Sequence, residues 1–92
     1  MKTIYKYYIN PSVEVLTFDS YACAKVISCG KDADENLCIW VDVATSMPAA
    51  PLKVYCVGTG WDLSSLFGDK NVNFVGTIVS EPYVWHVYQE VD

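Results

Sequence analysis

Turn-forming residues break the chain into short segments whose side chains alternate as they do in β-strands. Proline, glycine and asparagine supply the breaks, and long stretches with the 3.6-residue period of a helix are missing. Parallel strands need helical crossovers, which these short connections do not provide. The sequence therefore predicts an all-β fold, with a small antiparallel sheet rolled into a barrel or a sandwich. The expected strands are residues 3–9, 13–18, 23–29, 37–43, 52–57, 72–79 and 83–91.

Local signals add one helical turn and one strand pair. Residues 62–67 are expected to form the turn, because Asp62 is a good N-cap and Gly68 a good helix stop. The first two strands are separated by Asn10-Pro11-Ser12, and we expect them to pair as a hairpin or an edge pair.

The length and composition predict a single domain over residues 1–92. A chain of this size buries only about two-thirds of its surface on folding, so its core must be rich in apolar side chains. Hydrophobic residues make up 52% of the chain and aromatic residues 14%, which is enough for a core without metal ions or disulfides. We expect Trp40, in the strongest strand signal, to be part of that core.

Catalysis is disfavoured by what the composition lacks. The chain has no arginine and a single histidine, His86, so it cannot assemble a histidine metal cluster or an arginine clamp on a phosphoryl group. Ser64 and Ser65 have no visible base beside them. We expect a non-enzymatic protein without a cofactor.

The charge balance is acidic, with a net charge of −5 at pH 7. Duplex nucleic acid would be repelled and is not an expected partner. The acidity either keeps the protein soluble or docks it onto a basic protein surface. The acids that could form such a docking face are Asp32, Asp34, Glu35, Asp42, Asp62 and Asp69.

The four cysteines, Cys23, Cys29, Cys38 and Cys56, contain no closely spaced pair. A zinc site would require closer spacing or a second histidine, so no metal site is expected. We expect reduced thiols, with Cys38 and Cys56 as small core or sheet-face residues, and a disulfide between two of them stays open. The chain starts without an apolar signal segment and has no apolar run of about 20 residues, so we expect a soluble, cytoplasmic protein.

Two places carry candidate binding residues. Gly58-Thr59-Gly60 follows a strand and either presents backbone N–H groups to an anion or forms a tight turn, and Trp61 beside it either stacks on a ligand or covers the core. The last strand carries Tyr83, Trp85 and His86, and Lys53 is the candidate cation. We name Gly58, Thr59, Gly60, Trp61, Tyr83, Trp85, His86 and Lys53 as candidate binding residues.

A series of motifs resembles a family of small uncharacterised phage and prophage proteins. The motifs span nearly the whole chain in order: Ile4-Tyr5-Lys6-Tyr7, 24–28, 37–43, Val57-Gly58-Thr59-Gly60, 74–77 and Val84-Trp85-His86-Val87-Tyr88. This sequence departs from the family pattern at Cys38-Ile39, at Tyr88 and in the longer segment 61–70. The resemblance implies a phage gene whose product acts in the cytoplasm of the infected bacterium.

Small non-enzymatic phage proteins often bind host defences, and two such functions fit. The first is a counter-defence inhibitor that obstructs a bacterial immune protein, as anti-CRISPR proteins do. The second is a sponge that sequesters a cyclic-nucleotide or ADP-ribose-type immune signal between aromatic rings, glycine loops and lysines. The acidity and the missing arginines favour the first, because lysine alone grips phosphate less specifically. A structural or assembly role in the phage is a third alternative, and edge strands leave a homodimer open.

Overall fold

The computed structural model describes residues 1–11 and 15–91, and these residues form an all-β fold with one short helix. The start of the expected strand 13–18 lies outside the described residues. The other expected strands are confirmed to within a few residues at each end. The strands are β1 (Lys2–Tyr8), β2 (Val15–Tyr21), β3 (Lys25–Lys31), β4 (Leu37–Ala44), β5 (Ala49–Gly58), β6 (Asn71–Ser80) and β7 (Tyr83–Val91).

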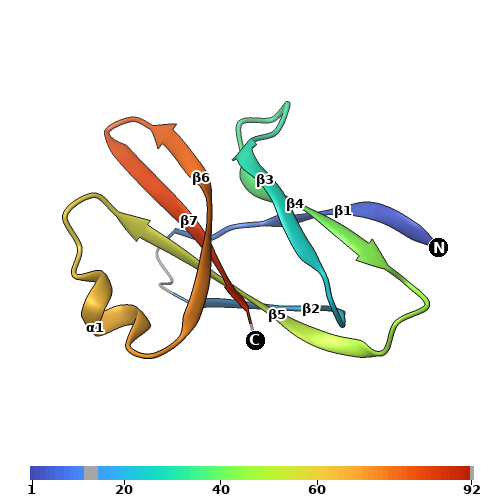
Figure 1. The fold of residues 1–92 in the computed structure, drawn as a ribbon. Helices are drawn as coiled ribbons and strands as arrows, with labels where there is room; N and C mark the ends of the chain where they lie inside the picture. Colours follow the sequence, from blue (N-terminus) through green and yellow to red (C-terminus); the bar gives the residue numbers. More distant parts are fainter. Residues whose placement is uncertain (12–14, 92) are drawn as a thin grey trace.

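The strands form two antiparallel sheets, which we call sheet A and sheet B (Figure 1). Sheet A has the order β1-β4-β3, and sheet B has the order β2-β5-β7-β6. Because the two sheets are not joined into one closed sheet, the fold is a sandwich rather than a barrel. The prediction of an antiparallel all-β domain is confirmed.

The main core lies between the inner faces of the two sheets. The central strands supply its fully buried side chains, since β4 and β5 each have a neighbour on both sides. Alternation along β4 places Ile39, Val41 and Val43 on the inner face, and β5 contributes Val54 and Cys56, all at most 1% exposed. The expected burial of Cys38 and Cys56 is confirmed, and all four cysteines are free thiols.

The predicted pairing of the first two strands is wrong. β1 pairs with β4, and β2 pairs with β5, so the two strands are edges of different sheets. They meet across the layers, where the hydroxyl of Tyr7 donates to the carbonyl of Asp19 at 3.1 Å and its ring lies 5.0 Å from that of Phe18. Pairing each strand with a more apolar central strand lets Tyr7 and Phe18 pack on the core, which a local hairpin would not achieve.

The prediction for Trp40 is also wrong. Because Trp40 alternates with the buried residues of β4, its side chain lies on the outer face of sheet A, where its neighbours on the flanking strands are Lys6 and Ser28. It is partly exposed there. The apolar pattern identified β4 correctly but did not show which face of the strand is buried.

The helical turn is confirmed as α1 (Leu63–Phe67), which covers part of the outer face of sheet B. The side chain of Asp62 accepts hydrogen bonds from the backbone N–H groups of Ser64 and Ser65, and Gly68 ends the helix with a positive φ of 55°. Its Phe67 packs edge-on against Tyr55 and Tyr88 of the sheet, at 5.0 Å from each ring. These rings form a second, smaller core outside the sandwich.

Candidate functional site

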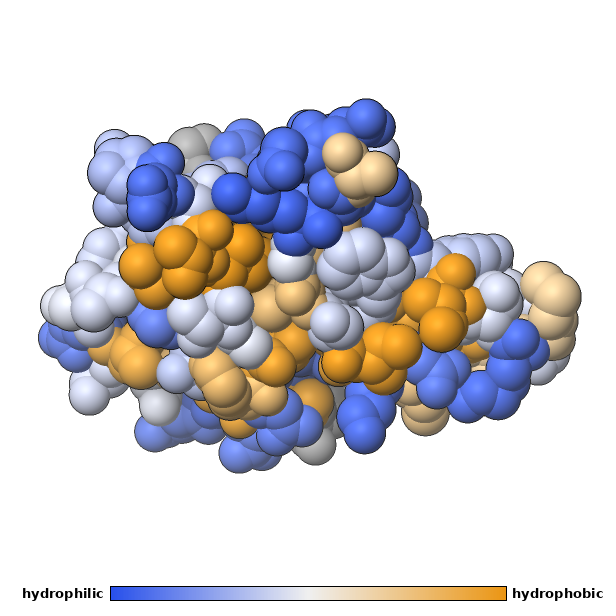
Figure 2. All heavy atoms as spheres, turned by 90° about the horizontal axis from the view of Figure 1, so that it is seen from above, coloured by the Kyte–Doolittle hydropathy of each residue, from blue (hydrophilic) through white to orange (hydrophobic). Residues whose placement is uncertain are grey.

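Exposed apolar side chains gather at the turn end of the β6–β7 hairpin, and Figure 2 shows apolar patches on the face of the molecule seen from above. Trp85 contacts two other rings: Tyr83 at a centroid distance of 5.5 Å and Trp61 at 6.0 Å. On the other face of the hairpin, Val79 pairs with Val84. Tyr83 is 60% exposed, Val79 61% and Trp61 43%. We call this group of five residues the apolar tip: Trp61, Val79, Tyr83, Val84 and Trp85.

The glycine loop holds Trp61 in the apolar tip. A Cβ atom at Gly58 would lie 2.8 Å from Nε1 of Trp61, so only glycine leaves room for the indole. Gly60 has a φ of +89°, and the backbone N–H of Trp61 donates to the carbonyl of Gly58 at 3.3 Å. The geometry favours a tight turn that seats an aromatic ring over the alternative of an anion cradle.

His86 lies on the opposite face of β7 from Trp85 and is held by two hydroxyl groups. Thr59 Oγ1 lies 2.8 Å from its Nε2 atom, and Thr77 Oγ1 lies 3.0 Å from its Nδ1 atom. A hydroxyl can either donate or accept, so both ring nitrogens have a partner in either tautomer. Among the residues that the structure describes, no carboxylate bonds to this ring, and the arrangement positions the glycine loop on β7.

Lys53 is separated from the other candidate binding residues. It lies toward the start of β5, whereas Gly58, Thr59, Gly60 and Trp61 lie at and beyond its end. Its ammonium group lies 3.9 Å from a carboxylate oxygen of Glu90. The structure therefore brings together the glycine loop and the aromatic residues and leaves Lys53 at a second place in the fold.

The six candidate acids do not converge on one face. Asp32, Asp34 and Glu35 lie in the β3–β4 turn, Asp42 lies on the outer face of sheet A, and two acids flank α1 on the other side of the view in Figure 1. Three of the six form ion pairs: Asp32 with Lys6 at 3.1 Å, Glu35 with Lys31 at 3.5 Å and Asp42 with Lys2 at 3.2 Å. The acids at α1 are Asp62 and Asp69.

Two of these acids accept hydrogen bonds that lower the pKa of their carboxyl groups. The backbone N–H of Asn36 donates to Asp32, and together with the Lys6 ammonium and the N–H of Asp34 it lowers the pKa of the carboxyl group. Hydrogen bonds from the hydroxyl and N–H groups of Ser65 lower the pKa of Asp62 in the same way. Both carboxylates stay charged at neutral pH and order a turn and a helix start.

Acidic groups flank the apolar tip. A shallow hollow of about 360 Å³ beside it is lined by Trp61, Asp62, Ser65 and Leu66. Glu81 lies in the β6–β7 turn, two residues before Tyr83. A partner that covers the tip would meet aromatic rings and negative charge together.

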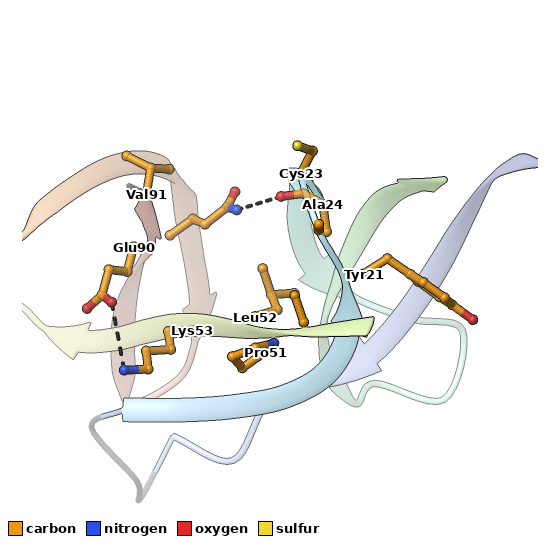
Figure 3. A pocket seen from close by; sticks show the side chains of 11 residues that line it. Tyr21, Cys23, Ala24, Pro51, Leu52, Lys53, Glu90 and Val91 are labelled. Atoms are coloured by element: carbon orange, nitrogen blue, oxygen red, sulfur yellow. Dashed lines mark hydrogen bonds and ion pairs between the residues drawn. The ribbon is translucent and has the colours of Figure 1, made fainter. Parts of the chain in front are cut away.

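A larger cavity lies between β5 and β7, at the end of the sheet where Lys53 lies (Figure 3). Its volume is about 540 Å³, within the range of small-ligand sites. The sequence did not reveal it, because it arises where two neighbouring strands separate. The alternation of side chains around Val79 and around Val84 predicted two strands, but it did not show that these two valines of the apolar tip are exposed. The cavity is lined by Tyr21, Ala22, Cys23, Ala24, Ala50, Pro51, Leu52, Lys53, Gln89, Glu90 and Val91.

The described part of the chain shows no helix of the length and apolarity that a membrane crossing requires. Within residues 1–11 and 15–91, no cluster of histidine, cysteine and acidic side chains has the arrangement of a metal site.

Comparisons with curated proteins and with solved structures give no match. One family model matches residues 1–92, and its description is a domain of unknown function, DUF7352. The chain therefore belongs to this family of small uncharacterised proteins.

Proposed function

We propose that this chain is a non-enzymatic binding protein whose apolar tip docks on another protein and obstructs it. The observation that supports this function best is the ring cluster of the tip, in which Trp85 is flanked by the exposed rings of Trp61 and Tyr83. Tryptophan and tyrosine supply most of the binding energy at many protein interfaces. Such a group of exposed rings on a small domain is typical of an interaction site.

The charge around the tip favours a basic partner surface. Asp62 and Glu81 border the tip, and the protein as a whole carries a net charge of −5. A protein surface that normally binds nucleic acid is basic and would attract this end of the molecule. Together with the resemblance to phage and prophage proteins, this supports a counter-defence inhibitor that obstructs a bacterial immune protein in the infected cell.

Sequestration of a nucleotide signal is the second candidate, because both hollows are large enough to admit part of a nucleotide. The charged residues that line the two hollows argue against this candidate. Among the described residues that line them, the only lysine is Lys53, which faces the carboxylate of Glu90, and the hollow beside Trp61 carries Asp62. A phosphate group would meet a carboxylate at either place, which disfavours tight binding.

A plaque assay tests the proposed function. The protein is expressed in bacterial strains that each carry one defence system, CRISPR systems included, and the plating of a sensitive phage is counted. We expect the natural sequence to restore plating on at least one strain and Tyr83→Ala to abolish this effect. Tyr8→Ala is the matched control, because Tyr8 is also an exposed tyrosine, at 57% against 60%, and lies on sheet A.

The proposal fails if the protein restores plating on none of the strains, or if Tyr83→Ala behaves like Tyr8→Ala. A thermal-shift panel with cyclic di- and trinucleotides and ADP-ribose separates the second candidate. A nucleotide at about 100 times its Kd would stabilise the fold by about 2.7 kcal/mol. Such a shift would replace protein obstruction by signal sequestration.

A further inference from the structure

Sheet B splits at one end, where β5 and β7 separate. The two strands pair from Val54 opposite Gln89 to Gly58 opposite Trp85. Beyond Val54, β5 continues back to Ala49 and keeps only β2 as a neighbour. Beyond Gln89, β7 continues to Val91 and keeps only β6. Within residues 1–11 and 15–91, two strand edges therefore face each other without a strand between them.

The cavity of about 540 Å³ occupies this split. Figure 3 shows Pro51 and Leu52 of β5 on one side and Cys23 and Ala24 of the β2–β3 turn on the opposite side. Lys53 and Glu90 face each other at a third side, where the ion pair is long at 3.9 Å. Most of the wall is small and apolar, and its charged groups are of opposite sign.

Gln89 shows what kind of group satisfies a strand edge here. Its side-chain oxygen accepts from the backbone N–H of Val26 at 2.8 Å, and its side-chain nitrogen donates to the carbonyl of Ala24 at 2.8 Å. In a sheet, the N–H and C=O of one residue of an adjacent strand, which belong to two successive peptide groups, make such a pair of hydrogen bonds to a strand edge. The buried amide of Gln89 thus takes the place of one strand residue beside the start of β3.

From these observations we propose that the split in sheet B binds a short extended peptide of another protein, which adds a strand along residues 49–53 of β5. This inference goes beyond the proposed function and does not depend on it, since the split and the apolar tip lie at opposite ends of the β5–β7 pair. Backbone hydrogen bonds to the open edge supply the affinity, as in other proteins that add a peptide strand to a sheet. Five strand residues span about 17 Å.

The wall defines the peptide that fits. Ala24, Ala50 and Leu52 leave room for small apolar side chains on the inward face. The ammonium group of Lys53 has only the long ion pair among the described residues and can turn to an acidic side chain of the peptide. Glu90 stays in place, because it also accepts a hydrogen bond from the Tyr55 hydroxyl at 2.6 Å, and it offers its negative charge to a basic side chain. Pro51 has no N–H, so this residue cannot donate a backbone hydrogen bond to a neighbouring strand.

The test uses a displayed library of random seven-residue peptides and the whole domain. We expect selected peptides to shift the backbone amide resonances of residues 21–24, 50–53 and 89–91 and to slow hydrogen exchange of the β5 amides. Ala50→Phe fills the cavity and should weaken binding by about tenfold or more, which corresponds to the loss of about one net hydrogen bond or its contacts. Ala33→Phe is the matched control, because Ala33 is exposed in the β3–β4 turn, outside residues 49–53, and does not line the cavity.

A second measurement leaves the protein unchanged, in case Ala50→Phe disturbs folding. Methylation of single backbone nitrogens in the selected peptide removes one donor at a time, and strand pairing requires that alternate positions lose binding. The inference is overturned if no peptide is selected, if the resonance shifts map to the apolar tip, or if methylation has no effect at any position. Tyr83→Ala should leave peptide binding unchanged, so failure of the apolar tip as a docking site would not be mistaken for failure here.

Discussion

The substitution Gly58→Ala tests how the glycine loop positions the apolar tip. The new Cβ atom would lie 2.8 Å from Nε1 and 3.0 Å from Cε2 of Trp61. Ordinary contacts between such atoms are about 3.5–4.0 Å, so the indole must retreat by roughly 0.5–1 Å or turn away. Trp61 is 43% exposed and can move, which means that the clash is relieved at the cost of its contact with Trp85.

The expected cost comes from that contact. An aromatic pair contributes about 0.5–1.5 kcal/mol beyond the area it buries, so Gly58→Ala should destabilise the domain by about 1 kcal/mol. In a Trp61→Ala background the clash is gone. There the same substitution should stabilise the domain by about 0.4–1 kcal/mol, because alanine restricts the unfolded chain and φ at this position is not in the left-handed region.

Urea unfolding of the four proteins in this double-mutant cycle measures both values. The change of sign between the two backgrounds is the distinguishing result. If Gly58→Ala costs the same with and without Trp61, the glycine is required for some other reason and the steric account is wrong. Tryptophan fluorescence of Gly58→Ala provides a separate readout, since displacement of Trp61 exposes it further to iodide quenching.

Four further predictions concern the framework. Gly76→Ala places a Cβ atom 2.9 Å from Sγ of Cys29 and should cost about 1–3 kcal/mol in urea unfolding, with Cys29→Ala restoring part of the loss. Burial, with the hydrogen bond to Glu90, raises the pKa of Tyr55 to about 12. The stability that the neutral hydroxyl contributes is therefore complete below about pH 10 and should fall between pH 10 and 12, and Tyr55→Phe should remove this fall. The pKa of Asp32 is lowered, so its contribution to stability has the opposite pH dependence. This contribution is complete above about pH 4 and should be lost on acidification, and Asp32→Asn should lose less stability over the same pH range than the natural protein does. Trp40→Ala should cost about 1–2 kcal/mol by thermal unfolding, well below the loss for a buried tryptophan, and a larger loss would contradict its partial exposure.

Local structure was predictable because its causes lie close together in the sequence. Alternation of side chains identified β4 and β7, since each strand has one apolar face whatever its neighbour is. The cap by Asp62 and the stop at Gly68 fixed α1 in the same way, because both act on residues a few positions away. The approach of Thr59 to His86 had no such local cause and was not expected.

Pairing of strands was not predictable, because it depends on which apolar faces meet in space. The segments on either side of Asn10-Pro11 suggested a hairpin, yet each strand gains more contact from a central strand of a different sheet. The split between β5 and β7 arises from the same non-local choice, since β5 follows β2 at one end and β7 at the other. The cavity and the open strand edges therefore left no trace in the local pattern.

Most of the positive charges of this protein are paired within it, which limits the ligands that it can bind. Among the described residues, four of the six lysines form ion pairs with carboxylates of the protein, and Lys70 lies over the ring of Tyr55 at 5.8 Å. A cation that must first leave its own carboxylate contributes little net energy to a phosphate contact. What the fold offers a partner is the exposed rings of the apolar tip and the edge of β5 at Leu52, beside which the described residues place no strand. The rings can be buried against the side chains of another protein, and the strand edge can pair with an extended peptide. The surface therefore favours a protein partner over a nucleotide.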